Sequence, residues 1–138
     1  MNIILGNIFV VYVEDDRSNR RVMSLLMKRG LGIKDYVEFE DTSNFMQRLA
    51  NLQRRPDILL LDIHVQPHNG FEILQMLRKH PEYAGTKTIA LTASVTNEEV
   101  EQLRSRGFDG AIGKPIKLST FEDLLRRILS GEAVWSIS

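Results

Sequence analysis

The stretch that decides the fold reads IFVVYVEDD and covers residues 8–16. Its first six residues are apolar, β-branched or aromatic, and three consecutive carboxylates follow them. Such a run predicts a strand buried on both faces, as parallel sheets require, because no alternation of polar residues marks an exposed face. The abrupt change at Glu14 predicts that the strand ends where polar chemistry begins.

Four further short runs have the character of strands, and helical patterns separate them. The runs cover residues 36–39, 58–61, 88–92 and 110–113. The expected helices cover residues 17–29, 42–53, 71–77, 96–107 and 119–129. Strand and helix therefore alternate five times, and this alternation indicates an α/β fold with an open parallel sheet.

Two of these helices carry more specific expectations. In the first, five residues at helical spacing predict its apolar face, namely Val22, Met23, Leu25, Leu26 and Met27. Asp16 is expected to cap its start. Residues 96–99 and 119–122 each have the form of a capping box, which predicts where the fourth and fifth helices begin.

Composition limits the classes of function. The chain has 138 residues, about one domain, with 43% hydrophobic residues and no cysteine, which excludes disulfides and thiolate metal sites. Its 18 basic and 18 acidic residues cancel, so charge predicts neither nucleic acid nor membrane as a partner. Without a spanning run or a signal peptide in the sequence, we expect a cytoplasmic location.

Polar residues follow four of the expected strands directly. Parallel strands joined by right-handed crossovers place their carboxyl ends at one edge of the sheet, where ligands of such folds bind. The residues expected to meet there are Glu14, Asp15, Asp62, Thr92 and Lys114. Crowded carboxylates favour a hard divalent cation, for which Mg²⁺ fits, and lysine and threonine complement phosphoryl oxygens. A carboxylate can itself attack phosphorus and form an aspartyl phosphate.

Four short segments follow the expected strands in order: Val13-Glu14-Asp15-Asp16, Leu61-Asp62 with Gly70 eight positions on, Leu91-Thr92-Ala93 and Lys114-Pro115-Ile116. Together they resemble the receiver domain of response regulators, the CheY-like phosphorylation switch of two-component systems. The resemblance covers about residues 8–130. It implies a doubly wound, flavodoxin-like fold with five strands in the order 2-1-3-4-5 and helices on both faces.

The resemblance also implies a role for each site residue. Asp62 is the expected phosphoacceptor and, with Asp15 and the backbone carbonyl of His64, an expected ligand of Mg²⁺. Glu14 is expected to help bind the ion through water.

On the phosphoryl side, the resemblance implies three contacts. Lys114, Thr92 and the backbone amide of Ala93 are expected to contact the phosphoryl oxygens. The Lys114–Pro115 peptide is expected to be cis.

The expected biology is that of a stand-alone receiver rather than an enzyme acting on other molecules. Residues 1–7 form an extension that is either disordered or covers part of the sheet, 8–130 the receiver, and 131–138 a tail. A histidine kinase or histidine phosphotransfer protein would donate the phosphoryl group, and the output would be a downstream protein target. Two alternatives stay open: an aspartate-nucleophile phosphatase, which wants a second aspartate where His64 stands, and a phosphorylation-independent interaction module.

The chain departs from the family pattern at two places. Val65-Gln66 stand where Met-Pro is usual, so we expect a locally altered loop beside an intact site. Ala111 stands where the family usually has an aromatic partner of the threonine. We therefore expect signalling to use the loops after Thr92 and Asp62, where Ser94 and His64 would flank the path of an attacking water.

Overall fold

The computed structural model describes residues 3–93 and 96–136, and Ser94 therefore lies outside the described residues. Its centre is a parallel sheet with strand order β2-β1-β3-β4-β5-β6. The strands are β1 (Phe9–Val13), β2 (Asp35–Phe39), β3 (Ile58–Asp62), β4 (Lys87–Thr92), β5 (Gly110–Gly113) and β6 (Val134–Ser136). The expected α/β class and the order of the first five strands are confirmed.

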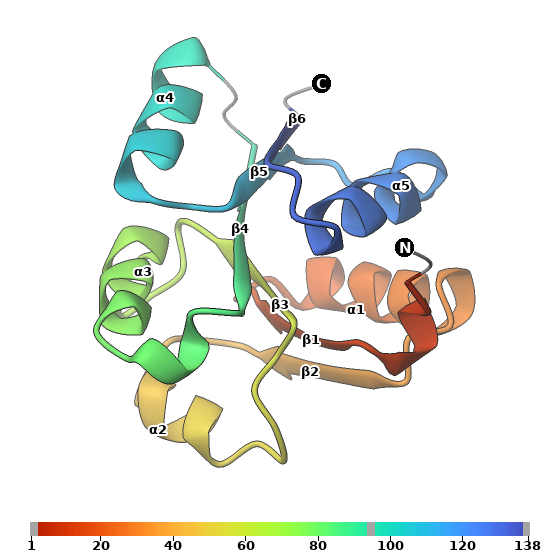
Figure 1. The fold of residues 1–138 in the computed structure, drawn as a ribbon, viewed down its shortest axis with the longest axis horizontal. Coiled ribbons are helices and arrows are strands. Elements are labelled where there is room, and N and C mark those ends of the chain that lie inside the picture. Colours follow the sequence, from red (N-terminus) through yellow and green to blue (C-terminus); the bar gives the residue numbers. More distant parts are fainter. Residues whose placement is uncertain (1–2, 94–95, 137–138) are drawn as a thin grey trace.

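Helices cover both faces of the sheet, as expected. They are α1 (Arg17–Leu25), α2 (Phe45–Ala50), α3 (Gly70–Arg78), α4 (Asn97–Arg106) and α5 (Leu118–Leu129). Helices α1 and α5 lie on one face, and α2, α3 and α4 lie on the other (Figure 1). Within residues 3–93 and 96–136, no helix has both the length and the apolar character that a membrane crossing requires.

Each face of the sheet has its own apolar core, and β1 contributes to both. Val10 and Tyr12 point toward the core on the α1 side, whereas Phe9, Val11 and Val13 belong to the core on the opposite side. All five β1 residues are buried. The near-continuous apolar run therefore reflects burial on both faces of a central strand.

The five-strand expectation was wrong by one strand, because the segment expected to be a tail adds β6. This strand pairs in parallel with β5, with Val134 opposite Gly110 and Trp135 opposite Ala111. Val134 is only 2% exposed. A Cβ atom at position 110 would lie 2.6 Å from the carbonyl oxygen of Val134, so glycine permits this close pairing. A strand of three residues is too short to show periodicity in the sequence.

Residues 3–7 of the N-terminal segment pack over part of the sheet. Residues Leu5–Asn7 form a 3₁₀ turn, and Leu5 is buried in the core on the α1 side. Ile3 packs against the same core. The sequence left open whether this segment is disordered or covers the sheet, and the contacts of Ile3 and Leu5 with the core support the second possibility.

The expected apolar face of α1 was too wide. Met23, Leu26 and Met27 are buried, but Val22 and Leu25 are 59% and 50% exposed. On a helix, each of these two residues lies about 100° around the axis from the buried residue that follows it. The helix continues as a π-helical segment over Leu26–Gly30.

The capping predictions had mixed outcomes. Asp16 caps α1 as expected, since its Oδ1 accepts a hydrogen bond from the amide of Ser18 at 2.7 Å. The hydroxyl of Thr96 likewise accepts from the amide of Glu99, at 3.2 Å. The capping box expected at 119–122 was wrong, because α5 begins at Leu118 and those residues already lie inside the helix.

Candidate functional site

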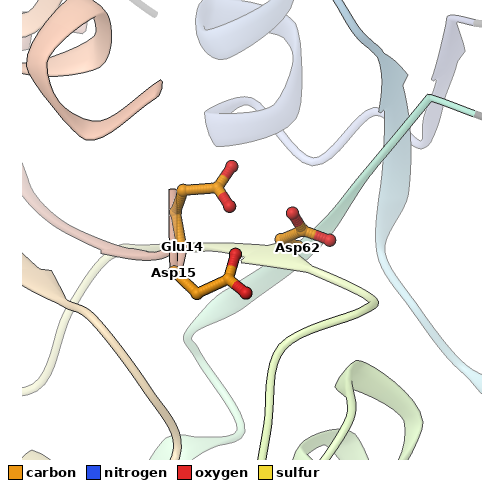
Figure 2. Close-up of side chains that lie close together, drawn as sticks. All are labelled: Glu14, Asp15 and Asp62. Carbon is orange, nitrogen blue, oxygen red and sulfur yellow. The ribbon is translucent and has the colours of Figure 1, made fainter. Parts of the chain in front are cut away.

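The polar residues expected at the carboxyl edge of the sheet do meet there. Glu14 and Asp15 directly follow β1, Asp62 is the last residue of β3, Thr92 ends β4 and Lys114 directly follows β5. The three carboxylates turn toward one another from two neighbouring strands (Figure 2). The convergence expected from strand alternation is therefore present in the fold.

The carboxylates form a cluster that could hold a metal ion. One oxygen from each of Glu14, Asp15 and Asp62 lies within 4.8 Å of the others. Glu14 and Asp62 are 1% and 7% exposed, whereas Asp15 is exposed. Three hard oxygen donors, one of them open to solvent, suit a divalent cation that keeps some water ligands.

Lys114 bridges the two buried members of this cluster. Its ammonium nitrogen Nζ lies 2.8 Å from Oε1 of Glu14 and 2.8 Å from Oδ2 of Asp62. Burial alone would lower the pKa of Lys114, but the hydrogen bonds to Asp62 and Glu14 raise it. The lysine therefore carries a positive charge that the two carboxylates share.

Glu14 is the most tightly held carboxylate of the cluster. Besides Lys114, its Oε1 accepts hydrogen bonds from the Tyr12 hydroxyl at 3.0 Å and from Nδ2 of Asn19 at 3.1 Å. Its Oε2 accepts from the amide of Asp16 at 3.3 Å. Burial would raise the pKa of Glu14, but its interactions with Lys114, Asp62 and the amide of Asp16, led by the Lys114 hydrogen bond, lower it to about 2.

Two members of this arrangement, Tyr12 and Asn19, were missed by the sequence analysis. Tyr12 is 2% exposed, and burial together with the Glu14 charge raises its pKa, so the hydroxyl remains a donor. The signal for Tyr12 was its position two residues before Glu14, which places both on the same face of an extended chain. For Asn19, one helical turn after Asp16, the sequence carried no comparable signal.

Asp15 has the opposite character. Partial burial and the nearby negative charges of Glu14 and Asp62 raise its pKa. Although Lys114 pairs with Glu14 and Asp62, the ionised form of Asp15 is still disfavoured by these two neighbouring carboxylates.

The residues expected to contact a phosphoryl group lie at the same edge of the sheet as Asp62. Thr92 is buried, its carbonyl oxygen accepts from the amide of Lys114 at 2.9 Å, and Ala93 is exposed at the end of β4. The amide of His64 donates to Oδ1 of Asp62 at 2.9 Å. The metal-ligand role of the His64 carbonyl remains a prediction. The Lys114–Pro115 peptide is cis, as predicted.

The loop after Asp62 is anchored by a residue that sequence reasoning did not single out. The buried Thr42 hydroxyl donates to the carbonyl of His68 and accepts from the amide of His68, both at 2.7 Å. At the end of the loop, a Cβ on Gly70 would lie 2.8 Å from Cα of Ile63, which explains the need for glycine at this spacing. The altered loop sequence is therefore compatible with a firmly held loop.

Comparison with protein families gives one match that spans most of the chain. Residues 10–126 match the family model described as response regulator receiver domain. The matched region contains each of the five polar residues at the sheet edge.

Curated relatives include both short and long proteins. The chain is 29% identical to a nitrate/nitrite response regulator protein homolog of Haemophilus influenzae, covering 82% of this chain and 56% of that protein. It is 27% identical to the polar-differentiation response regulator DivK of Brucella anthropi, covering 87% and 94%. It is 25% identical to the histidine-protein kinase BarA of Escherichia coli, covering 92% and 13%. The chain thus spans about half of the first relative and a small part of the kinase.

Solved structures share the fold. The chemotaxis response regulator CheY4 of Vibrio cholerae superposes with a TM-score of 0.77 at 21% identity, covering 88% of this chain and 98% of that one. The signal receiver domain of a histidine kinase from Syntrophus aciditrophicus gives 0.76 at 21% identity, covering 90% and 91%. At these identities the likeness concerns the fold alone.

Proposed function

Because the chain belongs to the family of response regulator receiver domains of two-component systems, we propose that Asp62 is its phosphoacceptor. The observation that supports this most directly is the ammonium of Lys114, 2.8 Å from Asp62 Oδ2 within a cluster of three carboxylates. A positive charge at that distance can stabilise negative charge developing on a phosphoryl group bound to the aspartate.

In the proposed reaction, a carboxylate oxygen of Asp62 attacks the phosphorus of a phosphohistidine on the donor protein. The new P–O bond forms as the P–N bond breaks, and the imidazole leaves with the electron pair and takes up a proton. Lys114, the Thr92 hydroxyl and the Ala93 amide are the proposed donors to the phosphoryl oxygens. The amide of His64, 2.9 Å from Oδ1, orients the carboxylate for attack.

We propose Mg²⁺ as the ion of the acidic cluster. Asp15, Asp62 and the His64 carbonyl would be its ligands, and Glu14 would act through water. The water-mediated role suits Glu14, since its Oε1 already accepts three hydrogen bonds from protein groups. When bound, Mg²⁺ supplies positive charge that offsets repulsion between the carboxylates and the incoming phosphoryl oxygens.

The partners follow from the same proposal. The donor is a histidine kinase or a histidine phosphotransfer protein, the output is a downstream protein target, and the location is the cytoplasm. The chain is proposed to catalyse only its own phosphorylation and dephosphorylation.

Incubation with Mg²⁺ and acetyl phosphate, followed by intact-mass measurement, tests the proposal. We expect one added phosphoryl group, labile to acid and lost in Asp62→Asn. Steady hydrolysis of free phosphomonoesters would support the phosphatase alternative instead. An unchanged mass under conditions that phosphorylate a known receiver would support the interaction module.

A further inference from the structure

Two tyrosine–glutamate pairs of the same design lie side by side in the sheet. On β1 the Tyr12 hydroxyl donates to Glu14, and on β2 the Tyr36 hydroxyl donates to Oε2 of Glu38 at 2.8 Å. The two strands are in parallel register, with Tyr12 opposite Glu38. In each pair the tyrosine stands two residues before the glutamate, so both side chains lie on one face of the strand.

The surroundings of the two carboxylates differ. On β2, Tyr36 is half-buried against the core on the α1 side, but Glu38 and its hydrogen bond to Tyr36 are exposed to solvent. In the β1 pair, Tyr12 and Glu14 are 2% and 1% exposed, and Glu14 also binds Lys114. The Tyr12 ring packs in the core on the α1 side, so its hydroxyl links that core to the acidic cluster. A hydrogen bond to a buried charge contributes more than the same bond in solvent.

We propose that Tyr12 is a positioning residue of the phosphoacceptor site, assisted by Asn19, and that its hydroxyl sets the orientation of Glu14 toward the cation. Side chain and backbone donors approach Glu14 from four places: β1, the start of α1, the first turn of α1 and the residue after β5. Together these four donors hold the Glu14 carboxylate in a single orientation.

The consequence concerns cation binding more than the chemical step. A ligand or outer-sphere partner that is held in place before the ion arrives loses less freedom on binding, and groups that orient such partners affect metal affinity. Removing the Tyr12 hydroxyl leaves Glu14 with three of its four donors. We therefore expect weaker Mg²⁺ binding, while the reaction at saturating Mg²⁺ proceeds through unchanged Asp62 and Lys114.

The test compares Tyr12→Phe with Tyr36→Phe in the full chain. Both variants lose one hydroxyl and keep the ring, but the second removes a hydrogen bond to the exposed Glu38 instead of one to the buried Glu14. Isothermal titration with Mg²⁺ should give a dissociation constant about threefold to tenfold higher for Tyr12→Phe, below the roughly tenfold to hundredfold effect of losing a whole outer-shell partner. Tyr36→Phe should match the wild type.

A second readout uses acetyl phosphate. For Tyr12→Phe the Mg²⁺ concentration giving half-maximal phosphorylation should rise by the same factor, with the maximal rate within about twofold of wild type. In the metal-free protein, the carboxyl ¹³C shift of Glu14 should change in Tyr12→Phe and stay constant in Tyr36→Phe. If Tyr12→Phe lowers only thermal stability and leaves Mg²⁺ affinity and this shift unchanged, the positioning role is refuted.

Asn19→Ala protects the test against a folding failure of the core variant. Asn19 is exposed and donates to the same Glu14 oxygen, so its loss should also weaken Mg²⁺ binding without affecting the core. Unchanged affinity in this variant would equally contradict the proposal. The inference rests on the proposed function only for its kinetic readout. If the wild-type protein binds Mg²⁺ but accepts no phosphoryl group, the proposed function is overturned. The Mg²⁺ affinities and the ¹³C shifts of the variants still decide the role of Tyr12.

Discussion

The two sides of the acidic cluster differ in how firmly their side chains are held. We refer to Glu14, Tyr12, Asn19 and Lys114 as the anchored side, because hydrogen bonds of 2.8–3.1 Å join each of the others to Glu14. Asp15 and Ala93 form the open side, and both are exposed. Asp62 lies between them. In this site, Lys114 compensates the negative charges of Glu14 and Asp62, whereas the charge of Asp15 remains exposed to solvent.

This difference explains how a cluster of three carboxylates can exist in a stable fold. Burying Glu14 and Asp62 is costly unless their charge is paired, and Lys114 pairs both. The remaining repulsion falls on Asp15, where water can reduce it. Binding of a cation on the open side therefore requires little rearrangement of the anchored side.

The largest expected effect is at Asp62, where the two sides meet. Asp62→Asn should abolish acid-labile phosphorylation by acetyl phosphate, because an amide lacks the nucleophilic carboxylate oxygen. Intact mass and peptide mapping provide the measurement, and Asp123→Asn on the exposed surface of α5 is a suitable control. Phosphorylation of Asp62→Asn to the wild-type level would refute the assignment.

The second largest effect is expected when the cation of the anchored side is removed. Lys114→Met should lower the free energy of unfolding by about 2–3 kcal/mol, since it leaves two buried carboxylates without their cation; the usual 3–5 kcal/mol is reduced because the lysine is 19% exposed. Urea unfolding measures the loss. Added Mg²⁺ should stabilise this variant more than the wild type, because the ion then replaces the missing charge. If Mg²⁺ stabilised the variant and the wild type equally, the ion and Lys114 would not be compensating the same carboxylates.

The open side should respond in the opposite direction. Asp15→Asn should weaken Mg²⁺ binding yet raise the free energy of unfolding by about 0.5–1 kcal/mol at pH 7, a value kept small by solvent screening. The pKa of Asp15 is raised in the folded state, so its ionised form disfavours folding, and this cost disappears as the pH falls through that pKa. The stability difference between variant and wild type should therefore shrink on acidification, which urea unfolding at several pH values can measure.

Glu14 should show the reverse pH dependence. Its pKa is lowered from 4.5 to about 2, so its contribution to stability is present above the unfolded value and is lost as the pH falls toward 2. Glu14→Gln should lose that contribution at neutral pH and show a flatter stability profile between pH 5 and about 2. A profile identical to wild type would show that the anchored side does not couple to folding.

The smallest expected effect lies away from both sides. Ala111→Gly should cost about 0.5–1 kcal/mol of stability, as glycine does in a strand, and leave phosphorylation-dependent partner binding nearly unaltered. Hydrogen exchange should instead detect phosphorylation mainly at residues 64–70 and 93–97. A response confined to the surroundings of Ala111, which pairs with Trp135 of β6, would contradict the expected route of the signal.

Much of the site was predictable because it depends on topology. Once strands end at Val13, Asp62 and Thr92, a parallel arrangement brings the residues at those ends together whatever the details of packing. Lys114 could be added for the same reason. The assignment of individual roles, in contrast, came from resemblance to a family.

Other features could not be read from local patterns. The strand at Val134 depends on the open edge of β5 and on the absence of a side chain at Gly110. The exposure of Val22 and Leu25 depends on which arc of α1 meets the sheet. In both cases the deciding partner lies far away in the chain.

By itself, the sequence determined the class of the fold, the edge at which the site lies and the set of charged groups there, because alternating apolar runs and their polar ends are local properties. Only the tertiary structure decided which carboxylate is anchored and which is open. Glu14 and Asp15 are adjacent in the chain and similar in chemistry, but Glu14 faces Tyr12, Asn19 and Lys114 whereas Asp15 faces solvent. That distinction arises from donors on β1, on α1 and directly after β5, whose distances to a Glu14 oxygen are set only once the chain has folded.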